Sequence, residues 1–257
     1  MEFFKVKIDE YIATITFNRP PANALSSNVL KELTSLLDTI ESNDDVRVLV
    51  IHGEGRFFSA GADIKEFTTI NSGEEFSELA RKGQDLFERM ERYPKPIIAS
   101  IHGAALGGGL ELAMACHFRL VSKNAKLGLP ELQLGLIPGF AGTARLPRYV
   151  GIAKAAQMLW TSDPVSGVEA VQYGLANEAF PEEKLHEETM KIARKIAQKS
   201  PLSVKATIEL LNSMKNEQYE ETVKREAELF GEMFISEDGK EGISAFIEKR
   251  QPTFKGK

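Results

Sequence analysis

The sequence predicts an α/β fold, and two observations support this. Through the first two thirds of the chain, short segments rich in β-branched residues alternate with segments whose apolar residues recur at helical spacing. From about residue 143 onward the periodicity is mainly helical. With 257 residues, of which 42% are hydrophobic and 27% charged, the chain can form one large globular domain or a domain with a smaller appendage.

The chain is predicted to begin with a β-hairpin that leads into a helix and a further strand. Residues 3–8 and 11–17 are β-rich and are separated by a short turn. After a Pro-containing break, apolar residues fall on one helical stripe, with Ser26 placed as the N-cap. A β-branched strand is expected at residues 46–51, and the His-Gly-Glu-Gly segment that follows is expected to end it.

The same alternation then recurs. A helix is expected over about residues 73–92, a strand over 96–101 and, after a glycine-rich turn, an apolar helix near 108–116. The C-terminal third contains three further helical segments, at residues 182–199, 202–214 and 219–234. There are more amphipathic helices here than there are obvious surfaces of the chain for them to cover, so we expect some of them to pack against another subunit.

Charge and composition argue against several classes of protein. The net charge is −5 and the basic residues are scattered, so nucleic acid is not expected as a partner. No segment approaches the roughly 18 consecutive apolar residues of a membrane helix. The first residues carry no signal or transit pattern, so we expect a cytoplasmic protein with no membrane partner. Cys116, the single cysteine, lies in an apolar stretch and is expected to be a buried, reduced thiol.

Two turns rich in small residues are candidate sites. Residues 57–65 and 101–111 each leave a predicted strand and enter a predicted helix, and the second contains three consecutive glycines. Backbone N–H groups from two such turns, aimed at one oxygen, would form an oxyanion hole for enolate-like charge on a thioester carbonyl. Each turn alone is weak evidence, because such turns often only permit tight packing. The glycine run matches neither a dinucleotide fingerprint nor a phosphate loop.

Two glutamates are candidate acid/base groups. Glu111 directly follows the triple glycine in an otherwise apolar segment, where burial would raise its pKa toward neutrality. A carboxylate that serves only the dipole of the helix start fits that position equally well. Glu131 lies at a predicted strand or loop edge before the Gly- and Pro-rich segment 135–142. From the residue alone, a solvated loop acid is the favoured interpretation of Glu131.

Histidine and serine offer weaker candidates. His52, His102, His117 and His186 show no metal-ligand spacing, and Ser59 lacks the first glycine of a nucleophile elbow. A metal site and a serine triad are therefore not expected.

Taken together, several motifs resemble the crotonase, or enoyl-CoA hydratase/isomerase, superfamily. They are Ser-Ala-Gly-Ala-Asp-Ile-Lys at 59–65, His-Gly-Ala-Ala-Leu-Gly-Gly-Gly-Leu-Glu-Leu-Ala at 102–113 and Leu-Pro-Glu-Leu-Gln-Leu-Gly-Leu-Ile-Pro-Gly at 129–139. The early segment 18–25 and the closing segment 242–250 match as well and in the expected order, so the resemblance covers nearly the whole chain.

For the fold, the resemblance implies a spiral of ββα turns followed by a helical trimerisation region. We expect a catalytic spiral core at residues 1–195 and a helical oligomerisation region at 196–257. The resemblance also implies a homo-oligomer, either a trimer or a dimer of trimers. It agrees with the surplus of helices in the last third.

For the site, the resemblance implies that Glu111 and Glu131 are the two acid/base carboxylates and that the N–H groups of Ala62 and Gly108 form the oxyanion hole. The adenine end of coenzyme A would lie near Ala60, Asp63 and Ile64, and C-terminal residues, in part from a neighbouring subunit, would complete the coenzyme A pocket. The implied substrate-binding residues are Ala22, Ala24, Ala60, Asp63, Ile64, Lys65, Gly107, Pro130, Gly139, Phe230, Phe246 and Lys249. No metal or separate cofactor is expected, since coenzyme A is part of the substrate.

For the activity, the presence of both glutamates is informative, because relatives resembling double-bond isomerases commonly keep only the second. The implied reaction is reversible syn hydration of a trans-2-enoyl-CoA to a 3-hydroxyacyl-CoA in fatty acid β-oxidation, with an acyl-CoA thioester as the substrate. Alternatives are enoyl-CoA isomerisation, hydration of a branched enoyl-CoA and dehydration of a 3-hydroxyacyl-CoA. A non-catalytic or RNA-binding scaffold is disfavoured by the charge of −5 and the intact glutamates.

One segment departs from the pattern of the superfamily. Many hydratases read Pro-Gly-Ala-Gly-Gly-Thr-Gln-Arg-Leu where this chain has Pro-Gly-Phe-Ala-Gly-Thr-Ala-Arg-Leu at 138–146. Phe140 either narrows the acyl pocket or packs in the core, and the packing interpretation is favoured.

Overall fold

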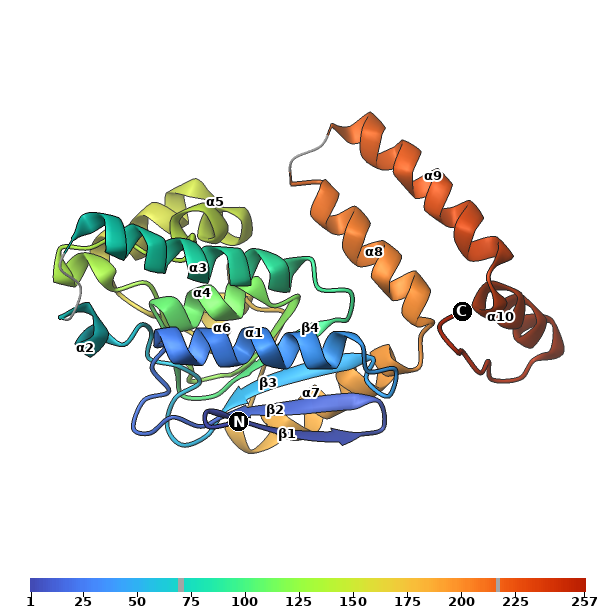
Figure 1. Cartoon of the computed structure of the whole chain (residues 1–257), viewed down its shortest axis with the longest axis horizontal. Helices are drawn as coiled ribbons and strands as arrows, with labels where there is room; N and C mark the ends of the chain where they lie inside the picture. Colours follow the sequence, from blue (N-terminus) through green and yellow to red (C-terminus); the bar gives the residue numbers. More distant parts are fainter. Residues whose placement is uncertain (69–71, 216–217) are drawn as a thin grey trace.

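The computed structural model describes residues 1–68, 72–215 and 218–257, and its body is built around a six-stranded sheet (Figure 1). The strand order is β1-β2-β3-β4-β6-β9; β1 and β2 are antiparallel, and the other neighbours are parallel. The strands are β1 (Phe4–Asp9), β2 (Ile12–Phe17), β3 (Val48–Gly53), β4 (Ile97–Ile101), β6 (Phe118–Ser122) and β9 (Glu178–Phe180).

A second, smaller sheet lies in the next layer. It contains β5 (Ala104–Leu106), β7 (Lys126–Gly128) and β8 (Val165–Ser166), in that order. The chain therefore enters the large sheet, crosses to the small one and then forms a helix, as in β4-β5-α4 and β6-β7-α5. Each such unit is one ββα turn, so the structure confirms the expected spiral.

The second layer continues into two earlier turns of the chain. Leu25 forms a parallel bridge with Ala62, and Ser59 forms one with Ala105. The small-residue segment after β3 thus lies beside β5, although more than 40 residues separate the two in the sequence. This side-by-side placement brings the two predicted turns together.

The helices follow the predicted pattern closely. Ser26 caps α1 as expected, because its hydroxyl accepts a hydrogen bond from the N–H of Val29. The end predicted for the third strand was wrong: β3 runs on through His52 and Gly53, which pair with β2. The helices are α1 (Ser27–Glu41), α2 (Ile64–Phe67), α3 (Gly73–Glu91), α4 (Gly108–Ala115), α5 (Gly142–Thr161), α6 (Gly167–Gln172), α7 (Glu182–Ala197), α8 (Pro201–Ser213), α9 (Tyr219–Ile235) and α10 (Glu237–Glu248).

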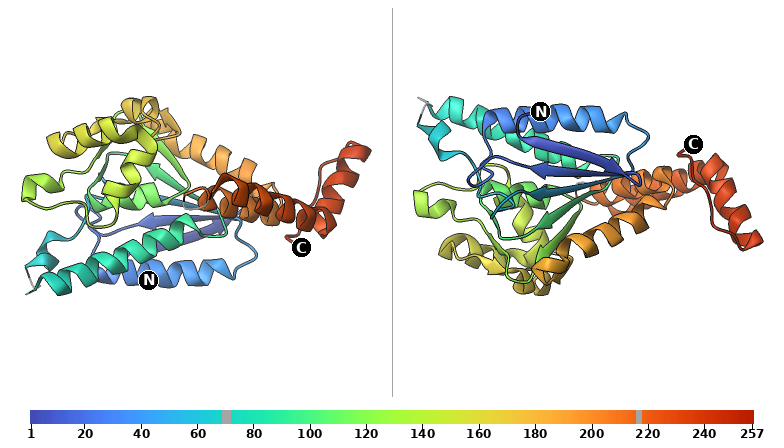
Figure 2. Two further views of the ribbon diagram at one scale, coloured as in Figure 1. Left: turned by 90° about the horizontal axis from the view of Figure 1, so that it is seen from above. Right: turned by 90° about the horizontal axis from the view of Figure 1, so that it is seen from below.

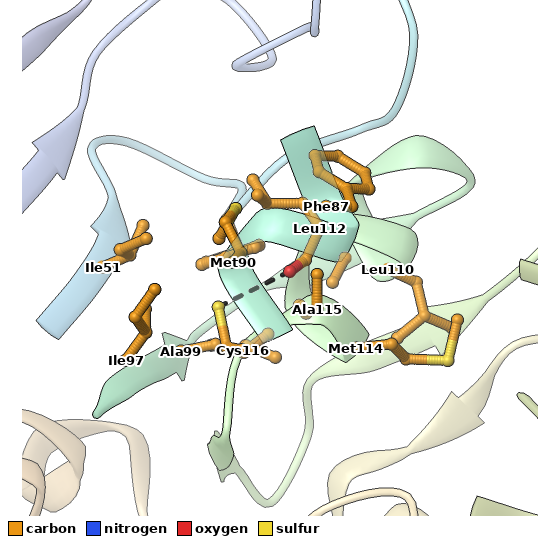
Figure 3. Packing of buried hydrophobic residues seen from close by; sticks show 14 of the residues in the cluster. Ile51, Phe87, Met90, Ile97, Ala99, Leu110, Leu112, Met114, Ala115 and Cys116 are labelled. Atoms are coloured by element: carbon orange, nitrogen blue, oxygen red, sulfur yellow. Dashed lines mark hydrogen bonds between the residues drawn. The ribbon is translucent and has the colours of Figure 1, made fainter. Parts of the chain in front are cut away.

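Helix α4 lies in the centre of the main hydrophobic core and is buried along its whole length (Figure 3). Phe87 and Met90 of α3 and Ile51 and Ile97 of the large sheet surround it. Cys116, at its end, is buried as predicted, and burial raises the pKa of its thiol to about 12. A carboxylate inside this helix therefore starts in an apolar environment.

Helix α7 covers the opposite face of the large sheet. A smaller cluster joins Val48, Val50 and Ile98 of the sheet to Leu185 and Ala193 of α7. The large sheet is thus covered on both faces, which explains its nearly continuous runs of apolar residues.

The last helices extend away from the body, as the three views agree (Figures 1 and 2). Helix α8 contacts α9, and α9 contacts α10. Among the described residues of α9, only Leu229 is buried, whereas Phe230, Phe234 and Ile235 are exposed. In the described part of the chain, no helix has the length and apolar character needed to cross a membrane.

Candidate active site

A pocket opens beside the N-terminus of α4 and gathers residues from four separate segments. Residues 60–67, helix α3, the start of α4 and the stretch 130–140, which contains η1 (Glu131–Leu134), all contribute to its wall. The predicted site residues that line it are Ala60, Ala62, Ile64, Gly107, Gly108, Glu111, Pro130, Glu131 and Gly139.

The two small-residue turns place their N–H groups in this pocket. A Cβ built on Gly108 would lie 3.4 Å from the nitrogen of Ala62, and one built on Gly61 would lie 3.4 Å from the nitrogen of Gly108. Neither the Ala62 N–H nor the Gly108 N–H donates a hydrogen bond to any described residue. The pair is therefore available to a ligand oxygen, and the Gly108 N–H lies at the positive end of α4.

Glu111 is the polar residue that α4 carries into the core, and it is only 1% exposed. Its Oε1 accepts hydrogen bonds from the N–H groups of Phe140 (2.8 Å) and Gly142 (2.7 Å). Burial, and then the negative charge of Glu131, raise the pKa of Glu111 to about 7, against the opposing effect of these two N–H groups. The carboxyl can therefore exchange protons near neutrality.

Glu131 begins η1 and lines the same pocket as Glu111. The interpretation of this residue as a solvated loop acid was wrong. Its Oε2 is buried and has no hydrogen-bond partner among the described residues, and burial raises the pKa of the carboxyl. A Cβ on Gly107 would lie 3.0 Å from Oε1 of Glu131, so the close approach of this carboxyl to the α4 turn depends on a glycine.

Arg145 supports the loop that holds Glu111, and we did not identify it from the sequence. Its side chain is almost fully buried, donates to the carbonyl of Phe140 and forms an ion pair with Glu91. Lys215, just after α8, also forms an ion pair with Glu91. Although burial opposes this, Lys215 and Arg145 hold the pKa of Glu91 below its usual value.

The segment expected to bind the adenine end lies at the rim of the pocket. Asp63 forms an ion pair with Arg19 (2.5 Å), which holds the pKa of Asp63 below its usual range, and it also caps α2 through the N–H of Lys65. The carbonyl of Ala22 accepts from the Ala60 N–H, and that of Ala24 accepts from Arg19. Of the predicted residues, Ala22, Ala24, Asp63 and Lys65 thus adjoin the pocket without lining it.

The three C-terminal residues expected to complete the coenzyme A pocket do not reach it within one chain. Phe230 is 75% exposed on α9, Phe246 is 86% exposed on α10, and Lys249 follows α10. Helix α2 contributes to the pocket, and α9 and α10 lie at the opposite end of the molecule from α2 (Figure 1). Phe230, Phe246 and Lys249 therefore do not line the pocket of their own chain.

Apolar residues that we did not single out form the rest of the wall. They are Phe67, Phe76, Leu79, Ala80, Leu134, Leu136 and Ile137. The sequence does offer a signal for them. Some lie on α3 outside the stripe that faces the core, and others lie in a Gly- and Pro-rich loop, and at both places polar, solvated residues would otherwise be expected. Within the described residues, no group of three or more metal-binding side chains gathers.

The arrangement supports acid/base chemistry on a polarised substrate. Two carboxyls with raised pKa values face the pocket, and two unpaired N–H groups can hold an oxygen on which negative charge develops. The apolar side chains of the wall offer no competing hydrogen-bond partners and lower the local dielectric constant, which strengthens these interactions. The pocket thus suits a carbonyl compound with an adjacent carbon that gains or loses a proton.

Comparison with known proteins agrees with this geometry. The family described as enoyl-CoA hydratase/isomerase matches residues 7–257. A probable enoyl-CoA hydratase of Bacillus subtilis is 57% identical over 100% of both chains, and a short-chain-enoyl-CoA hydratase of Clostridium acetobutylicum is 40% identical over 93% of this chain and 92% of its own. The crystal structure of an enoyl-CoA hydratase from Bacillus anthracis superposes with a TM-score of 0.94 at 36% identity, covering 99% of this chain and 100% of that one. This chain therefore belongs to the enoyl-CoA hydratase/isomerase family.

Proposed function

We propose that the protein is an enoyl-CoA hydratase that adds water across the double bond of a trans-2-enoyl-CoA. The observation that carries the proposal is the pairing of Glu111 and Glu131 in one pocket with the unpaired N–H groups of Ala62 and Gly108. Hydration needs one group to take a proton from water and another to deliver one to carbon, and this pocket has both. The relatives named above as hydratases support the same reaction.

In the proposed mechanism, the thioester oxygen accepts hydrogen bonds from the Ala62 and Gly108 N–H groups. The Glu111 carboxylate takes a proton from water as the water oxygen bonds to the β-carbon. The electron pair of the double bond then moves toward the thioester, where the two N–H groups stabilise the enolate. Glu131 donates its proton to the α-carbon from the same side, which gives syn addition, and a proton returns from Glu111 to Glu131 before the next turnover.

The proposal extends to the biological setting. We infer that the enzyme works in fatty acid β-oxidation and needs no cofactor, because coenzyme A arrives as part of the substrate. Isomerisation, branched-chain hydration and dehydration would use the same pocket, but two proton-handling carboxyls exceed what a simple double-bond shift requires.

Loss of the ultraviolet absorbance of crotonyl-CoA tests the activity, with the product identified by mass spectrometry. We expect hydration by the wild type and a loss of at least roughly a hundredfold in kcat for Glu111→Gln and for Glu131→Gln, the usual scale for acid/base groups. Glu187→Gln, at an exposed ion pair of α7, is the matched control and should remain active.

Three results would count against the proposal. Unchanged absorbance with several acyl chain lengths, while a known hydratase consumes the same samples, would reject the activity. Formation of a shifted double bond alone would favour an isomerase. Full activity in either glutamine variant would reject the role assigned to that residue.

We also propose that residues 196–257 form an oligomerisation region and that the protein is a homotrimer or a dimer of trimers. The exposed apolar side chains of α9 and α10 support this, since so many large apolar side chains in water are typical of a surface that another subunit covers. Phe230, Phe246 and Lys249 would then complete the coenzyme A pocket of a neighbouring copy. Sedimentation velocity should show three or six copies, and Lys249→Ala should raise KM for crotonyl-CoA with little change in kcat. A monomer with full activity would contradict both statements.

A further inference from the structure

Phe140 has one side in the core and the other in the pocket. It is 7% exposed, and its ring packs edge-to-face on the buried Phe87, with ring centroids 5.4 Å apart and an interplanar angle of 76°. The same residue lines the pocket together with Glu111 and Gly139. Core packing and contact with the pocket are therefore not alternatives at this position, because one ring does both.

The space that the Phe140 ring fills is made by glycines on two helices. A Cβ built on Gly83 of α3 would overlap the ring, and one built on Gly108 of α4 would lie 3.2 Å from its Cε2. Any larger residue at Gly83 would therefore push the ring toward the pocket. The ring is wedged between α3 and the start of α4, where interiors tolerate little change in volume.

The backbone of Phe140 fixes the position of this ring relative to the reacting groups. Its N–H donates to Oε1 of Glu111, and its carbonyl accepts from the buried guanidinium of Arg145. The backbone of Phe140 thus contacts the carboxyl that handles water in the proposed function, and its ring packs against Gly108, whose N–H would hold the thioester oxygen. If the substrate binds at the Glu111 carboxyl and the Gly108 N–H, the far end of its acyl chain lies close to the ring.

We propose that Phe140 is the floor of the acyl pocket and that it restricts the enzyme to short, straight acyl chains such as crotonyl. This inference rests on the proposed function and adds the substrate class. An acyl chain that continues past the β-carbon has α3 on one side, where Phe76, Leu79 and Ala80 line the pocket, and meets the ring at its end. The ring cannot retreat, because Phe87 lies behind it.

The test compares kcat/KM for crotonyl-CoA and trans-2-decenoyl-CoA in the wild type and in Phe140→Ala. We expect the wild type to prefer crotonyl-CoA and the ratio of decenoyl to crotonyl activity to rise at least about tenfold in the variant, the scale of a pocket altered by more than one methylene. Phe140→Leu should shift the ratio in the same direction by less, and it covers the case in which Phe140→Ala does not fold. Phe17→Ala, at a fully buried ring outside the pocket, controls for loss of core packing and should leave the ratio unchanged.

Gly83→Ala tests the position of the Phe140 ring by adding a methyl group on its α3 side. The added methyl group should displace the ring into the pocket and lower kcat/KM even for crotonyl-CoA, and the double variant Gly83→Ala/Phe140→Ala should recover that activity. This recovery is the non-additivity expected of two groups that compete for one space.

The outcomes separate this inference from the function on which it rests. A wild type that hydrates both substrates equally, or Phe140 variants whose ratio stays at the wild-type value, would overturn the role of Phe140 and leave the hydratase function intact. A wild type that hydrates no enoyl-CoA of any length would overturn the function, and this inference with it.

Discussion

Helices α4 and α9 both carry many apolar residues, yet their surroundings are opposite. Every residue of α4 is buried by its own chain, whereas α9 buries only Leu229 among its described residues and leaves Phe234 60% exposed. Their carboxylates differ in the same way. Glu111 in α4 has a strongly raised pKa, while Glu228 and Glu232 of α9 form exposed ion pairs with Arg225.

This contrast shows that environment, more than residue type, makes the candidate site. An exposed ion pair is screened by water and contributes little to stability, and it leaves a carboxylate with ordinary chemistry. The same side chain surrounded by apolar residues is held near the point where it can give or take a proton. The body therefore buries its apolar residues within one chain, whereas the C-terminal helices leave large apolar side chains exposed.

The largest expected difference concerns apolar residues on the two helices. Leu112→Ala in α4 should lower the free energy of unfolding by about 2–5 kcal/mol at every protein concentration, because it leaves a cavity in a core that one chain forms. Phe234→Ala in α9 should act mainly through association, so its effect on unfolding should fade as the protein is diluted. Urea unfolding at two concentrations, together with sedimentation velocity, measures both. A loss in Phe234→Ala that is the same at all concentrations would remove the contrast.

The next difference concerns pH. Because the folded-state pKa of Glu111 is raised from 4.5 to about 7, the native protein binds more protons than the unfolded chain between these values, and stability is lost as pH rises through them. Glu111→Gln removes this loss and keeps an oxygen for the two N–H donors. The stability of this variant relative to the wild type should therefore grow by roughly 2 kcal/mol between pH 5 and pH 8.

Denaturant unfolding over that pH range, at one protein concentration, tests this expectation. Glu228→Gln, at an exposed ion pair of α9, is the matched control for the removal of one carboxylate. If the wild type and Glu111→Gln respond to pH alike, Glu111 is not held in the environment described above.

The smallest expected effect separates the two causes of the raised pKa of Glu111. Glu131→Gln removes the negative charge across the pocket, so the pKa of Glu111 should fall below 7. It should stay above 4.5, since burial, the larger cause, remains. Difference infrared spectroscopy of the carboxyl band during a pH titration can follow it. An unchanged or higher pKa would mean that the two carboxyls do not interact.

Much of the fold could be predicted because its signals are local. The hairpin, the capped helix after Ser26 and the apolar helix around Glu111 depend on neighbouring residues, and the structure agrees with them. Glu111 was recognisable as a lone acid in an apolar helix. Glu131 was not, because its burial depends on α4 packing against a segment some 20 residues further along the chain.

The parts that could not be predicted depend on contacts between distant segments. Arg145 reaches Glu91 only once α3 and α5 lie together, and the Phe140 ring packs against α3 only because Gly83 leaves room. The reach of the C-terminal residues into another copy, the boundary near residue 195, the absence of a cofactor and a cytoplasmic location stay predictions.

Glu91, at the end of α3, connects the body of the molecule to the C-terminal helices. Its carboxylate forms ion pairs with Arg145 of the body and with Lys215, just after α8. Its backbone carbonyl accepts a hydrogen bond from the side-chain amide of Asn212 in α8. A tilt of the C-terminal helices against the body would stretch these contacts. Because Arg145 also donates to the carbonyl of Phe140, the tilt would displace the backbone whose N–H donates to the Glu111 carboxyl. Glu91 thus links the C-terminal helices to the loop around the Glu111 carboxyl, so a shift of these helices would change the contacts of that carboxyl.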